Sequence, residues 1–557
     1  MVKYAGGAFI PTIELDRKSP GSLSAQLVSG LRRLILSGHL AVGQRLPSSR
    51  TLAHDQGVSR ITVVTAYEQL TSEGLIASRV GAGTYVSVAL DIDRPLPAPK
   101  SFSGLSGAAA PRLARLSVDA SEQYFPRLSH PEAPCAFVTG MSANDQFPMA
   151  LWARLSAQYW RQPRNLVLGY PPAEGLYSLR RAITMHLQAN RGISCSPEDV
   201  FIFNGAQHAF NRIGQTLLNP GDKVWIENPG AIGARNSLIS SGADLVPVPV
   251  DDEGIDVAEG LRLSPDFRLA FVTPARQHPL GVTMSPGRRF ELLGAADRCG
   301  AWVIEDDYDG EFHYSGHPAA TLKSVDTSDR VIYVGTFSKV MFAALRLGYV
   351  VAPPALAQIF RRVAGATMQG SPASMQAIMA SFIEQGHFTT HIRRMRRIYA
   401  ERQKTLSDAA GRHLKGLLEV APTTTGFQTV GRLAPDFNDL EVVARAAKHG
   451  IVLSPISRFA IAPVERGLIL GFSAVPPAAI ETAVEKLGRL LRTMVVEKQQ
   501  ALAYPGKFRP LSPGRDPRES SPPPSRPPSC LAHSGFPKGS PGRSPRPPPA
   551  DRQFRAP

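Results

Sequence analysis

Apolar residues recur at helical spacing along the first part of the chain. From residue 20 to residue 36, leucine and isoleucine occupy positions three or four apart, which predicts an amphipathic helix. A second helix is expected to begin at Ser48 or Ser49 and a third at Ser59, because a serine hydroxyl can cap the free N–H groups of a helix start. The pattern therefore predicts three short helices in succession.

Two strands are expected to follow these helices. Residues 75–79 and 84–87 have the composition of short strands, and Gly81 and Gly83 lie in the turn between them. A hairpin that follows three helices in this way forms the wing of a winged helix-turn-helix. We therefore expect residues 10–88 to fold as one small α+β unit of that type.

The third helix has two chemically different faces. Val63, Ala66, Tyr67 and Leu70 lie at i, i+3, i+4 and i+7, so they are expected to form its buried face. Hydroxyl and amide groups on the opposite face can reach base edges in a DNA major groove, while arginines at the helix starts can reach phosphates. The candidate DNA-binding residues are Arg50, Ser59, Arg60, Thr62, Thr65 and Gln69, together with Gly81 and Gly83 of the wing.

Net charge alone is a weak argument for nucleic acid. The 557-residue chain has a formal net charge of +16, which favours an anionic partner. From Lys507 to the end, however, ten Lys or Arg residues stand against three Asp or Glu, so +7 belongs to this tail and +9 to the rest. The DNA hypothesis therefore depends on the polar face of the third helix.

Two segments lack the pattern of a folded unit. Residues 501–557 consist mainly of Pro, Arg, Ser and Gly, and they hold too few apolar side chains to offset the entropy lost on ordering. We expect this tail to be disordered, either as a solvated extension or as an electrostatic arm for DNA. Residues 89–135 are rich in Pro, Ala, Ser and Leu and are expected to be a linker.

The chain carries no sign of export or membrane insertion. Its four cysteines are scattered without a C-x-x-C pair, and no apolar run is long enough to span a bilayer. The N-terminus lacks the basic-then-apolar layout of a signal peptide. We expect a cytoplasmic protein without disulfides, a bound metal or membrane contact.

The longest region, residues 136–500, alternates short apolar runs with longer helical patterns. This alternation is typical of an α/β domain with a mainly parallel sheet. A small C-terminal α/β subdomain is expected at its end.

One predicted strand, residues 331–335, runs into a hydroxyl-rich turn that ends in Lys339. An amine held there in a desolvated and partly deprotonated state can form a Schiff base with an aldehyde. Thr336 and Ser338 offer hydroxyls to a phosphate, and Arg346 offers a guanidinium fork. A lysine after a strand is a weak signal by itself, because most lysines are solvated charges.

A cluster of acids follows another predicted strand, residues 301–304. Alternation along the strand places Asp306 and Tyr308 on one face and Asp307 on the other. In pyridoxal 5'-phosphate (PLP), a carboxylate beneath the pyridine nitrogen keeps it protonated and makes the ring an electron sink. We expect Asp306, ahead of Asp307, to pair with that nitrogen, and Tyr308 to bond the phenolic oxygen.

Two further turns complete the predicted site. Gly205-Ala206-Gln207 lies where a strand turns into a helix, and the free N–H groups at that helix start can cradle a phosphate. Residues 273–281 form a Pro-rich turn that is expected to lie over the cofactor. His278 or Gln277 could contact the phenolic oxygen from there, although a histidine in such a turn is as often a bystander.

The N-terminal unit resembles the DNA-binding domain of the GntR family. The resemblance spans the whole unit in the expected order and spacing. The matching residues are R-L-P-S-S-R (45–50), V-S-R-I-T-V (58–63), A-Y-E-Q-L (66–70), and E-G-L-I with R-V-G-A-G-T-Y-V (73–86).

The larger region resembles fold-type I aminotransferases, and more closely the MocR/PdxR subfamily, in which a GntR-type reader is joined to such a domain. The resemblance implies PLP linked to Lys339, a homodimer, and Tyr170 reaching the phosphate of the neighbouring subunit. It is carried by E-N-P-G (227–230), E-D-D-Y-D (305–309), T-F-S-K (336–339) and L-R-L-G-Y (345–349). The candidate cofactor-binding residues are Lys339, also the candidate catalytic residue, with Asp306, Tyr308, Arg346, Gly205, Ala206, Gln207, Thr336, Ser338 and Tyr170.

Some positions depart from that subfamily's pattern. Ala231 follows Pro-Gly, where an aromatic residue usually lies near the pyridine ring, and residues 273–277 are T-P-A-R-Q where T-P-S-H-Q is usual. Both changes bear on ring stacking and effector recognition, and neither removes the lysine. Arg458 is the best candidate to bind an effector carboxylate, although a solvated loop arginine is nearly as frequent.

Three functions fit these features. The leading hypothesis is a PLP-dependent transcription regulator that senses PLP or its adduct with an amine or amino acid. The alternative is an aminotransferase with an appended DNA-binding domain, because every residue needed for at least half-transamination is present. A DNA-binding scaffold with an inactive pocket is disfavoured by that same intact set. The complete winged helix favours regulation.

Overall fold

The chain folds as two compact units, residues 1–112 and 113–557. The computed structural model describes residues 10–11, 13–17, 19, 21–79, 83–87, 113–126, 131, 133–314, 319–368 and 370–503. The predicted wing residue Gly81 lies outside the described residues, as does nearly all of the predicted tail. No described helix is both long and apolar enough to cross a membrane.

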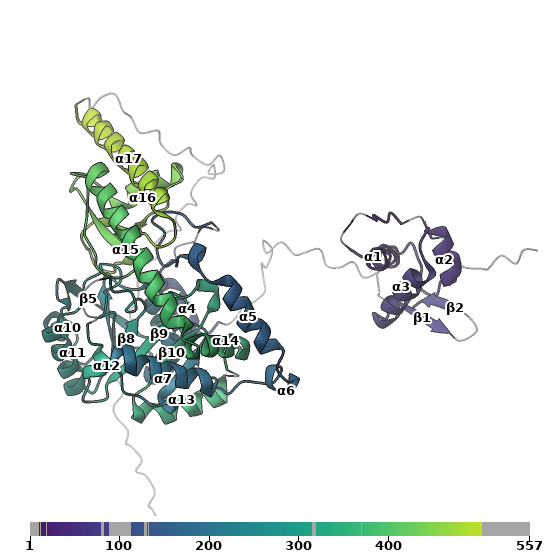
Figure 1. The fold of residues 1–557 in the computed structure, drawn as a ribbon, viewed down its shortest axis with the longest axis horizontal. Coiled ribbons are helices and arrows are strands. Elements are labelled where there is room, and N and C mark those ends of the chain that lie inside the picture. Colours follow the sequence, from purple (N-terminus) through teal and green to yellow (C-terminus); the bar gives the residue numbers. More distant parts are fainter. Residues whose placement is uncertain are drawn as a thin grey trace, which may run out of the picture. The chain divides into compact units, whose positions relative to one another are not determined.

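The first unit has the three helices and antiparallel hairpin that the sequence predicts (Figure 1). Each helix begins behind a serine whose hydroxyl accepts a backbone N–H, and Ser48 rather than Ser49 is the cap of the second. The elements are α1 (Leu23–Leu36), α2 (Ser49–Asp55), α3 (Arg60–Ser72), β1 (Ile76–Arg79) and β2 (Gly83–Val86).

Helix α3 is held by the face that the sequence predicts to be buried. Val63, Ala66, Tyr67 and Leu70 are all buried in the core of this unit. The Tyr67 hydroxyl donates to the Pro47 carbonyl oxygen at 2.9 Å, which ties α3 to the turn before α2. The opposite face of α3 is thereby fixed toward solvent.

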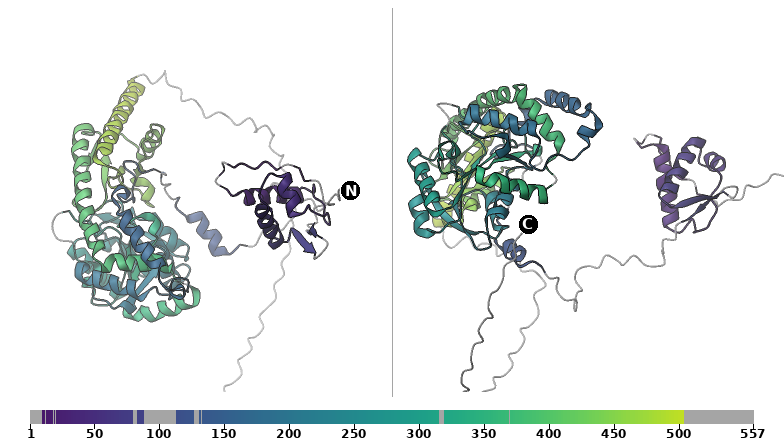
Figure 2. Two further views of the ribbon diagram at one scale, coloured as in Figure 1. Left: turned by 45° about the vertical axis from the view of Figure 1, so that its right-hand side comes forward. Right: turned by 90° about the horizontal axis from the view of Figure 1, so that it is seen from below.

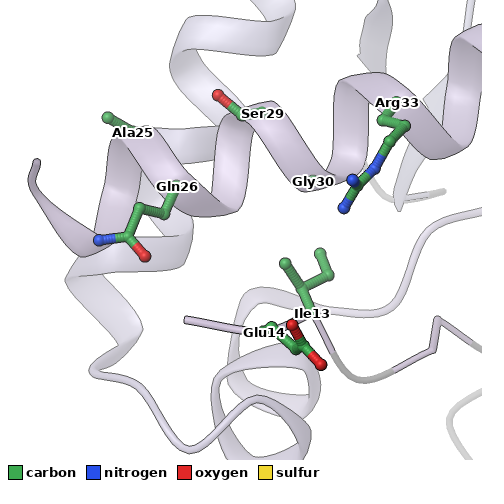
Figure 3. A pocket seen from close by; sticks show the side chains of 7 residues that line it. All are labelled: Ile13, Glu14, Ala25, Gln26, Ser29, Gly30 and Arg33. Atoms are coloured by element: carbon green, nitrogen blue, oxygen red, sulfur yellow. The ribbon is translucent and has the colours of Figure 1, made fainter. Parts of the chain in front are cut away.

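The segment before α1 packs on that helix through a glycine. A Cβ atom at Gly30 would lie 2.5 Å from Cγ2 of Ile13, so only glycine allows this close approach. Figure 3 shows Ile13 below Gly30, at one side of a shallow hollow of about 380 Å³. Ile13 is 8% exposed, so this contact closes one edge of the core.

The second unit is built on a mixed sheet that is mainly parallel, as predicted. Its strand order is β3-β10-β9-β8-β7-β4-β5-β6. The pairs from β9 to β5 are parallel, whereas β10 is antiparallel to both of its neighbours and β6 is antiparallel to β5. The strands are β3 (Val200–Phe203), β4 (Lys223–Asn228), β5 (Asp244–Asp251), β6 (Gly254–Ile255), β7 (Leu269–Val272), β8 (Trp302–Asp307), β9 (Val331–Thr336) and β10 (Gly348–Val351).

Helices cover both faces of this sheet (Figure 2). Alternation along each strand divides the core: Val224 and Ile226 of β4 pack on one face, and Trp225 packs on the other. One face is covered by α8 (Ala206–Leu217), α9 (Ile232–Ile239) and α13 (Pro354–Thr367). The other is covered by α5 (Met149–Trp160), α7 (Tyr177–Arg191), α10 (Val257–Leu263), α11 (Pro286–Cys299), α12 (Leu322–Val325), α14 (Ala373–Glu384) and the first part of α15 (His387–His413).

A small antiparallel sheet follows, as expected for a C-terminal subdomain. Its strand order is β11-β12-β14-β13. Helices α15 and α17 lie side by side (Figure 1), and α17 extends three residues into the predicted tail. The elements of this subdomain are β11 (Leu418–Val420), β12 (Gln428–Leu433), α16 (Asp439–Lys448), β13 (Ser454–Pro455), β14 (Gly467–Gly471) and α17 (Pro477–Ala503). The short helix α6 (Arg164–Val167) lies earlier in the second unit.

Within the described part of the range 89–135, which we predict to be a linker, residues Arg115–Gln123 form helix α4. This helix belongs to the second unit and contacts α9. The composition of the segment does not reveal it, because only Ala120 of α4 is buried and the contact is made with residues more than 100 positions away.

Replacing Gly30 by valine should destabilise the first unit. The new side chain displaces Ile13 and costs about 1–3 kcal/mol, as overpacking of a core does. Faster hydrogen exchange of the α1 amides in the full chain would report this loss. Ser29→Val is the matched control, because Ser29 is exposed on the same helix. Equal exchange rates in the two variants would contradict the prediction.

Candidate functional site

The sheet register brings the predicted cofactor residues to one edge. Asp306 of β8 lies opposite Val334 of β9. Gly348 of β10 is paired both with Thr336, the last residue of β9, and with Phe203, the last residue of β3. The acidic cluster, the lysine turn and the glycine turn therefore leave neighbouring strands at the same edge.

The glycine turn and Arg346 form a cradle for an anion. Gly205 has φ +88° and precedes α8, whose first N–H groups are free for a ligand. A Cβ atom at Gly205 would lie 3.3 Å from Cζ of Arg346, so the guanidinium reaches the helix start. Arg346 also donates to the Asn204 carbonyl oxygen at 3.2 Å. The cradle joins a helix N-terminus to an arginine fork, which suits a phosphate.

The turn before the lysine contains two hydroxyls with different roles. Oγ1 of Thr336 accepts the Ser338 N–H at 3.2 Å and donates to the Leu347 carbonyl oxygen, so it shapes the turn. Oγ of Ser338 is buried and has no hydrogen-bond partner among the described residues. Ser338 is therefore the hydroxyl that remains for a ligand.

Lys339 is held in the pocket by a backbone carbonyl from far away in the chain. Its Nζ donates to the Gly140 oxygen at 2.9 Å, and a Cβ atom at Gly140 would lie 2.5 Å from Nζ. Burial lowers the pKa of Lys339; the Asp306 carboxylate opposes this shift and Arg346 adds to it. A lowered pKa favours the neutral, nucleophilic amine. The sequence contains no local signal for Gly140, which lies 199 residues from the lysine.

The two neighbouring aspartates differ in how well they are satisfied. Asp307 forms a buried ion pair with Arg191 and also accepts the Tyr333 hydroxyl at 2.7 Å and the Gly310 N–H at 3.0 Å. Oδ1 of Asp306 is buried without a hydrogen-bond partner among the described residues. Burial, followed by repulsion from Asp307, raises the pKa of Asp306 well above its usual range.

Like Oγ of Ser338 and Oδ1 of Asp306, the Tyr308 hydroxyl is buried without a hydrogen-bond partner among the described residues. The ring of His278 lies 5.7 Å from the Tyr308 ring, edge to face, and 5.3 Å from that of Phe459. Burial, then the charges of Lys339 and two arginines, lowers the pKa of His278 to about 3, so this imidazole is neutral.

These unpartnered groups match the polar atoms of PLP. Asp306 suits a protonated ring nitrogen, Tyr308 a phenolic oxygen, Ser338 a phosphate oxygen, and Lys339 an aldehyde carbon. A buried polar group without a partner costs about 1–3 kcal/mol, so three together indicate that a ligand completes the pocket. Among the described residues there is no cluster suited to a metal ion.

The turn over the pocket uses Gln277 and Arg276 internally. The Gln277 amide donates to the Pro229 carbonyl oxygen at 2.8 Å, and its oxygen accepts the Leu280 N–H at 2.9 Å. Arg276 pairs with Asp309 at 3.3 Å and donates to Oγ1 of Thr423 at 2.9 Å. Of the two residues considered for the phenolic oxygen, His278 is therefore the one beside Tyr308.

Arg458 and Tyr170 lie in different surroundings. The carbonyl oxygen next to Arg458, that of Phe459, accepts the Gly230 N–H at 2.9 Å, so this loop adjoins the turn that contains Ala231. Tyr170 is 86% exposed within a single chain. A contact with a second subunit remains a prediction for Tyr170, as effector binding does for Arg458.

The predicted DNA-binding residues of the first unit differ in exposure and in their hydrogen bonds. Arg50, Arg60 and Thr65 are exposed. The hydroxyls of Ser59 and Thr62 bond each other at 2.8 Å as part of the helix cap, and the Gln69 amide donates to Glu73 at 3.1 Å.

Arg45 is a candidate that sequence reasoning missed. It bridges to Tyr85 of β2, and a Cβ atom at Gly83 would lie 2.7 Å from its Nε. Gly83 has φ +107°, which favours glycine. The basic side chain of Arg45 therefore lies along the wing. Arg45 lies shortly before the predicted cap Ser48, and nothing in this local sequence indicates its contact with the wing.

Two family models match the chain in the order of the two units. The model of bacterial regulatory proteins of the gntR family matches residues 23–86, and that of aminotransferase class I and II matches residues 141–487. The probable rhizopine catabolism regulatory protein MocR of Rhizobium meliloti is 40% identical over 475 residues, which cover 85% of this chain and 94% of that protein. The chain belongs to the MocR-type regulators of the GntR family.

Other relatives agree with this assignment. The pyridoxine biosynthesis transcriptional regulator PdxR of Corynebacterium glutamicum is 30% identical, over 83% of this chain and 94% of that protein. Among solved structures, kynurenine aminotransferase of Pyrococcus horikoshii superposes with a TM-score of 0.61 at 26% identity, over 65% of this chain and 92% of its own. This MocR-type chain is thus a DNA-binding transcription regulator with a PLP-binding aminotransferase fold.

The two aspartates should respond oppositely to removal of their charge. Asp307→Asn leaves Arg191 buried without a compensating charge and should cost about 3–5 kcal/mol. Asp306→Asn removes a buried carboxylate that lacks a partner, so the ligand-free protein should be equally or more stable. Urea unfolding followed by tryptophan fluorescence measures both, because all four tryptophans lie in the second unit. Similar losses in the two variants would contradict this assignment.

Proposed function

We propose that this MocR-type regulator holds PLP at the edge of its large sheet and changes its binding of DNA in response to PLP or a PLP adduct with an amine or amino acid. The observation that carries the proposal is the set of buried groups without partners, Asp306, Tyr308 and Ser338, around a lysine with a lowered pKa. Such a set is costly without a ligand and complementary to PLP.

Each residue has a distinct role in this proposal. PLP supplies an electron-withdrawing ring and an aldehyde when bound. Lys339 provides the neutral amine, Asp306 accepts the ring N–H, and Tyr308 donates to the phenolic oxygen. The phosphate is held by Ser338 and Arg346 together with the N–H groups of Ala206 and Gln207, while the Gly205 N–H bonds the Phe203 carbonyl oxygen and Thr336 keeps the turn in shape.

The DNA-reading role falls to α3 and the wing. Arg60 and Arg50 contact phosphates, and the exposed face with Thr65 and Gln69 approaches base edges in the major groove. Gly83 lets the wing pass close to Arg45. Two copies of α3 would be presented by a homodimer, in which Tyr170 reaches the partner's phosphate.

The effector belongs to the chemistry of amines and amino acids. Arg458 lies in the loop that adjoins the Ala231 turn, so it is placed to pair with a carboxylate beside the cofactor. The relatives are named for rhizopine catabolism and for pyridoxine biosynthesis. An amine adduct and PLP itself are both consistent with those two settings.

Replacing Lys339 by alanine should abolish the visible absorbance of the purified, PLP-loaded protein. The amine that links the cofactor is lost, while the rest of the pocket remains. Absorbance spectra recorded with added PLP measure this, and Lys404→Ala, a change at an exposed lysine, should keep the band. A wild-type protein that stays colourless with added PLP would contradict the cofactor proposal. Multiple-turnover transamination at ordinary enzyme rates would instead favour the aminotransferase alternative.

Replacing Arg60 by alanine should weaken binding of DNA from the region beside the protein's own gene. Loss of one phosphate contact should weaken binding about equally for every DNA sequence and lower the slope of log affinity against log salt by about 1. Fluorescence anisotropy over a series of salt concentrations measures the change. Arg33→Ala removes the same charge from an exposed position on α1 and should have a much smaller effect. Equal losses would show that net charge, not α3, determines binding.

A further inference from the structure

The segment that leads out of the first unit is fastened to α9. The N–H of Phe125 donates to Oδ1 of Asn236 at 2.9 Å, and Nδ2 of Asn236 donates to the Phe125 carbonyl oxygen at 2.9 Å. One side chain thus satisfies both backbone groups of one residue, as a neighbouring strand would. Residues 113–126, which comprise α4 and Phe125, are called the clasp below.

The Phe125 ring also lies against a buried cation. Cζ of Arg235 is 5.2 Å from the ring centroid, and Arg235 is fully buried on α9. Its Nη2 donates to the Glu227 carbonyl oxygen at 3.1 Å, but Nε and Nη1 have no hydrogen-bond partner among the described residues. The face of the Phe125 ring is therefore an important favourable contact of the Arg235 guanidinium. Loss of the clasp would remove this contact.

Helix α4 adds a packing contact at the far end of α9. A Cβ atom at Gly242, just after α9, would lie 3.2 Å from Cδ1 of Leu116. The clasp therefore touches α9 and the turn after it at more than one place. Such a contact is specific in register, because it combines a fixed hydrogen-bond pair with close packing.

The same helix is bonded to the phosphate cradle. Oγ of Ser237, the residue after Asn236, lies 3.3 Å from the Gln207 carbonyl oxygen, which shares the hydroxyl proton with the Gly233 carbonyl oxygen at 2.9 Å. Tyr124 of the clasp lines a hollow of about 460 Å³ together with Gln207, Asn236 and Arg346. Residues of the cradle and of the clasp thus line the same hollow, together with Asn236 of α9.

We infer that the clasp transmits the occupancy of the phosphate cradle to the chain that leads to the DNA-reading unit. A phosphate at the start of α8 orders Arg346 and the backbone of Gln207, and Ser237 passes this constraint to α9. Asn236 then holds Phe125 more firmly when the cradle is filled. The inference rests on the proposed binding of PLP. It requires the docked clasp to bind PLP more tightly than the released one.

Hydrogen exchange at the Phe125 amide tests the first half of this inference. In the full-length protein, added PLP should slow exchange of that amide by about fivefold or more, the lower end of ordinary allosteric coupling. Asn236→Leu keeps the size of the side chain but removes both bonds, so exchange should be fast with or without PLP. Asn211→Leu is the control, because Asn211 bonds Ser240, the residue just after α9, and not the clasp. Wild-type exchange that PLP does not change would overturn the inference.

DNA affinity tests the second half. With DNA from beside its own gene, the wild type and Asn211→Leu should show at least about a fivefold change in affinity on adding PLP. Asn236→Leu should keep the visible PLP band and bind DNA, yet show no PLP-dependent change. Phe125→Pro, which removes the N–H donor and the ring beside Arg235 but leaves the sequence of α9 unchanged, should behave in the same way. Retention of the PLP-dependent change in both variants would overturn the inference.

These outcomes are separate from failure of the proposed function. A colourless wild type would mean that PLP is not bound, and the clasp would then have nothing to report. A coloured wild type whose DNA affinity does not respond to PLP would refute the proposed response to PLP itself. A wild type that responds to PLP, with the response retained in Asn236→Leu and Phe125→Pro, would refute the clasp alone.

Discussion

The buried pair between Arg191 and Asp307 is the constraint on which the cofactor pocket depends. It fixes the end of β8 against α7, and the Tyr333 hydroxyl from β9 adds a second tie to the same carboxylate. Because alternate residues of a strand point to opposite faces, fastening Asp307 turns Asp306 toward the other side. The Asp307 carboxylate is thus bonded within the fold, and the Asp306 carboxylate remains available to a ligand.

The sequence predicts the parts of this site that are written locally. The buried face of α3, the serine caps of α2 and α3 and the strand that ends before Lys339 follow from spacing within one element, and the structure confirms them. Contacts between distant residues leave no such pattern. Gly140 meets Lys339 across 199 residues and Arg191 meets Asp307 across 116, so neither could be found from periodicity.

Residue types also do not reveal which polar groups are already hydrogen-bonded within the fold. Thr336 and Ser338 are both hydroxyl residues in one turn, yet only the Ser338 oxygen is left without a partner within the described part of the chain. Helix α4 illustrates a third limit. Its residues have the composition of a linker, and their order depends on α9, which supplies the bonding partner of Phe125.

The charges of the pocket give a physical reason for a sensor. Glu227 and Asp309 are buried and burial raises the pKa of each to about 7, while Asp306 is shifted in the same direction. Ionising such buried carboxyl groups is costly by itself, and a cationic ring nitrogen beside Asp306 offsets part of that cost. In the same way, a phosphate offsets the charge of Arg346 in the cradle. A ligand that satisfies both ends stabilises only the conformation in which they face each other. The unsatisfied pocket and the filled pocket therefore differ in stability by an amount that depends on ligand concentration, which is the property that a regulator needs and that a catalyst with a permanently bound cofactor does not.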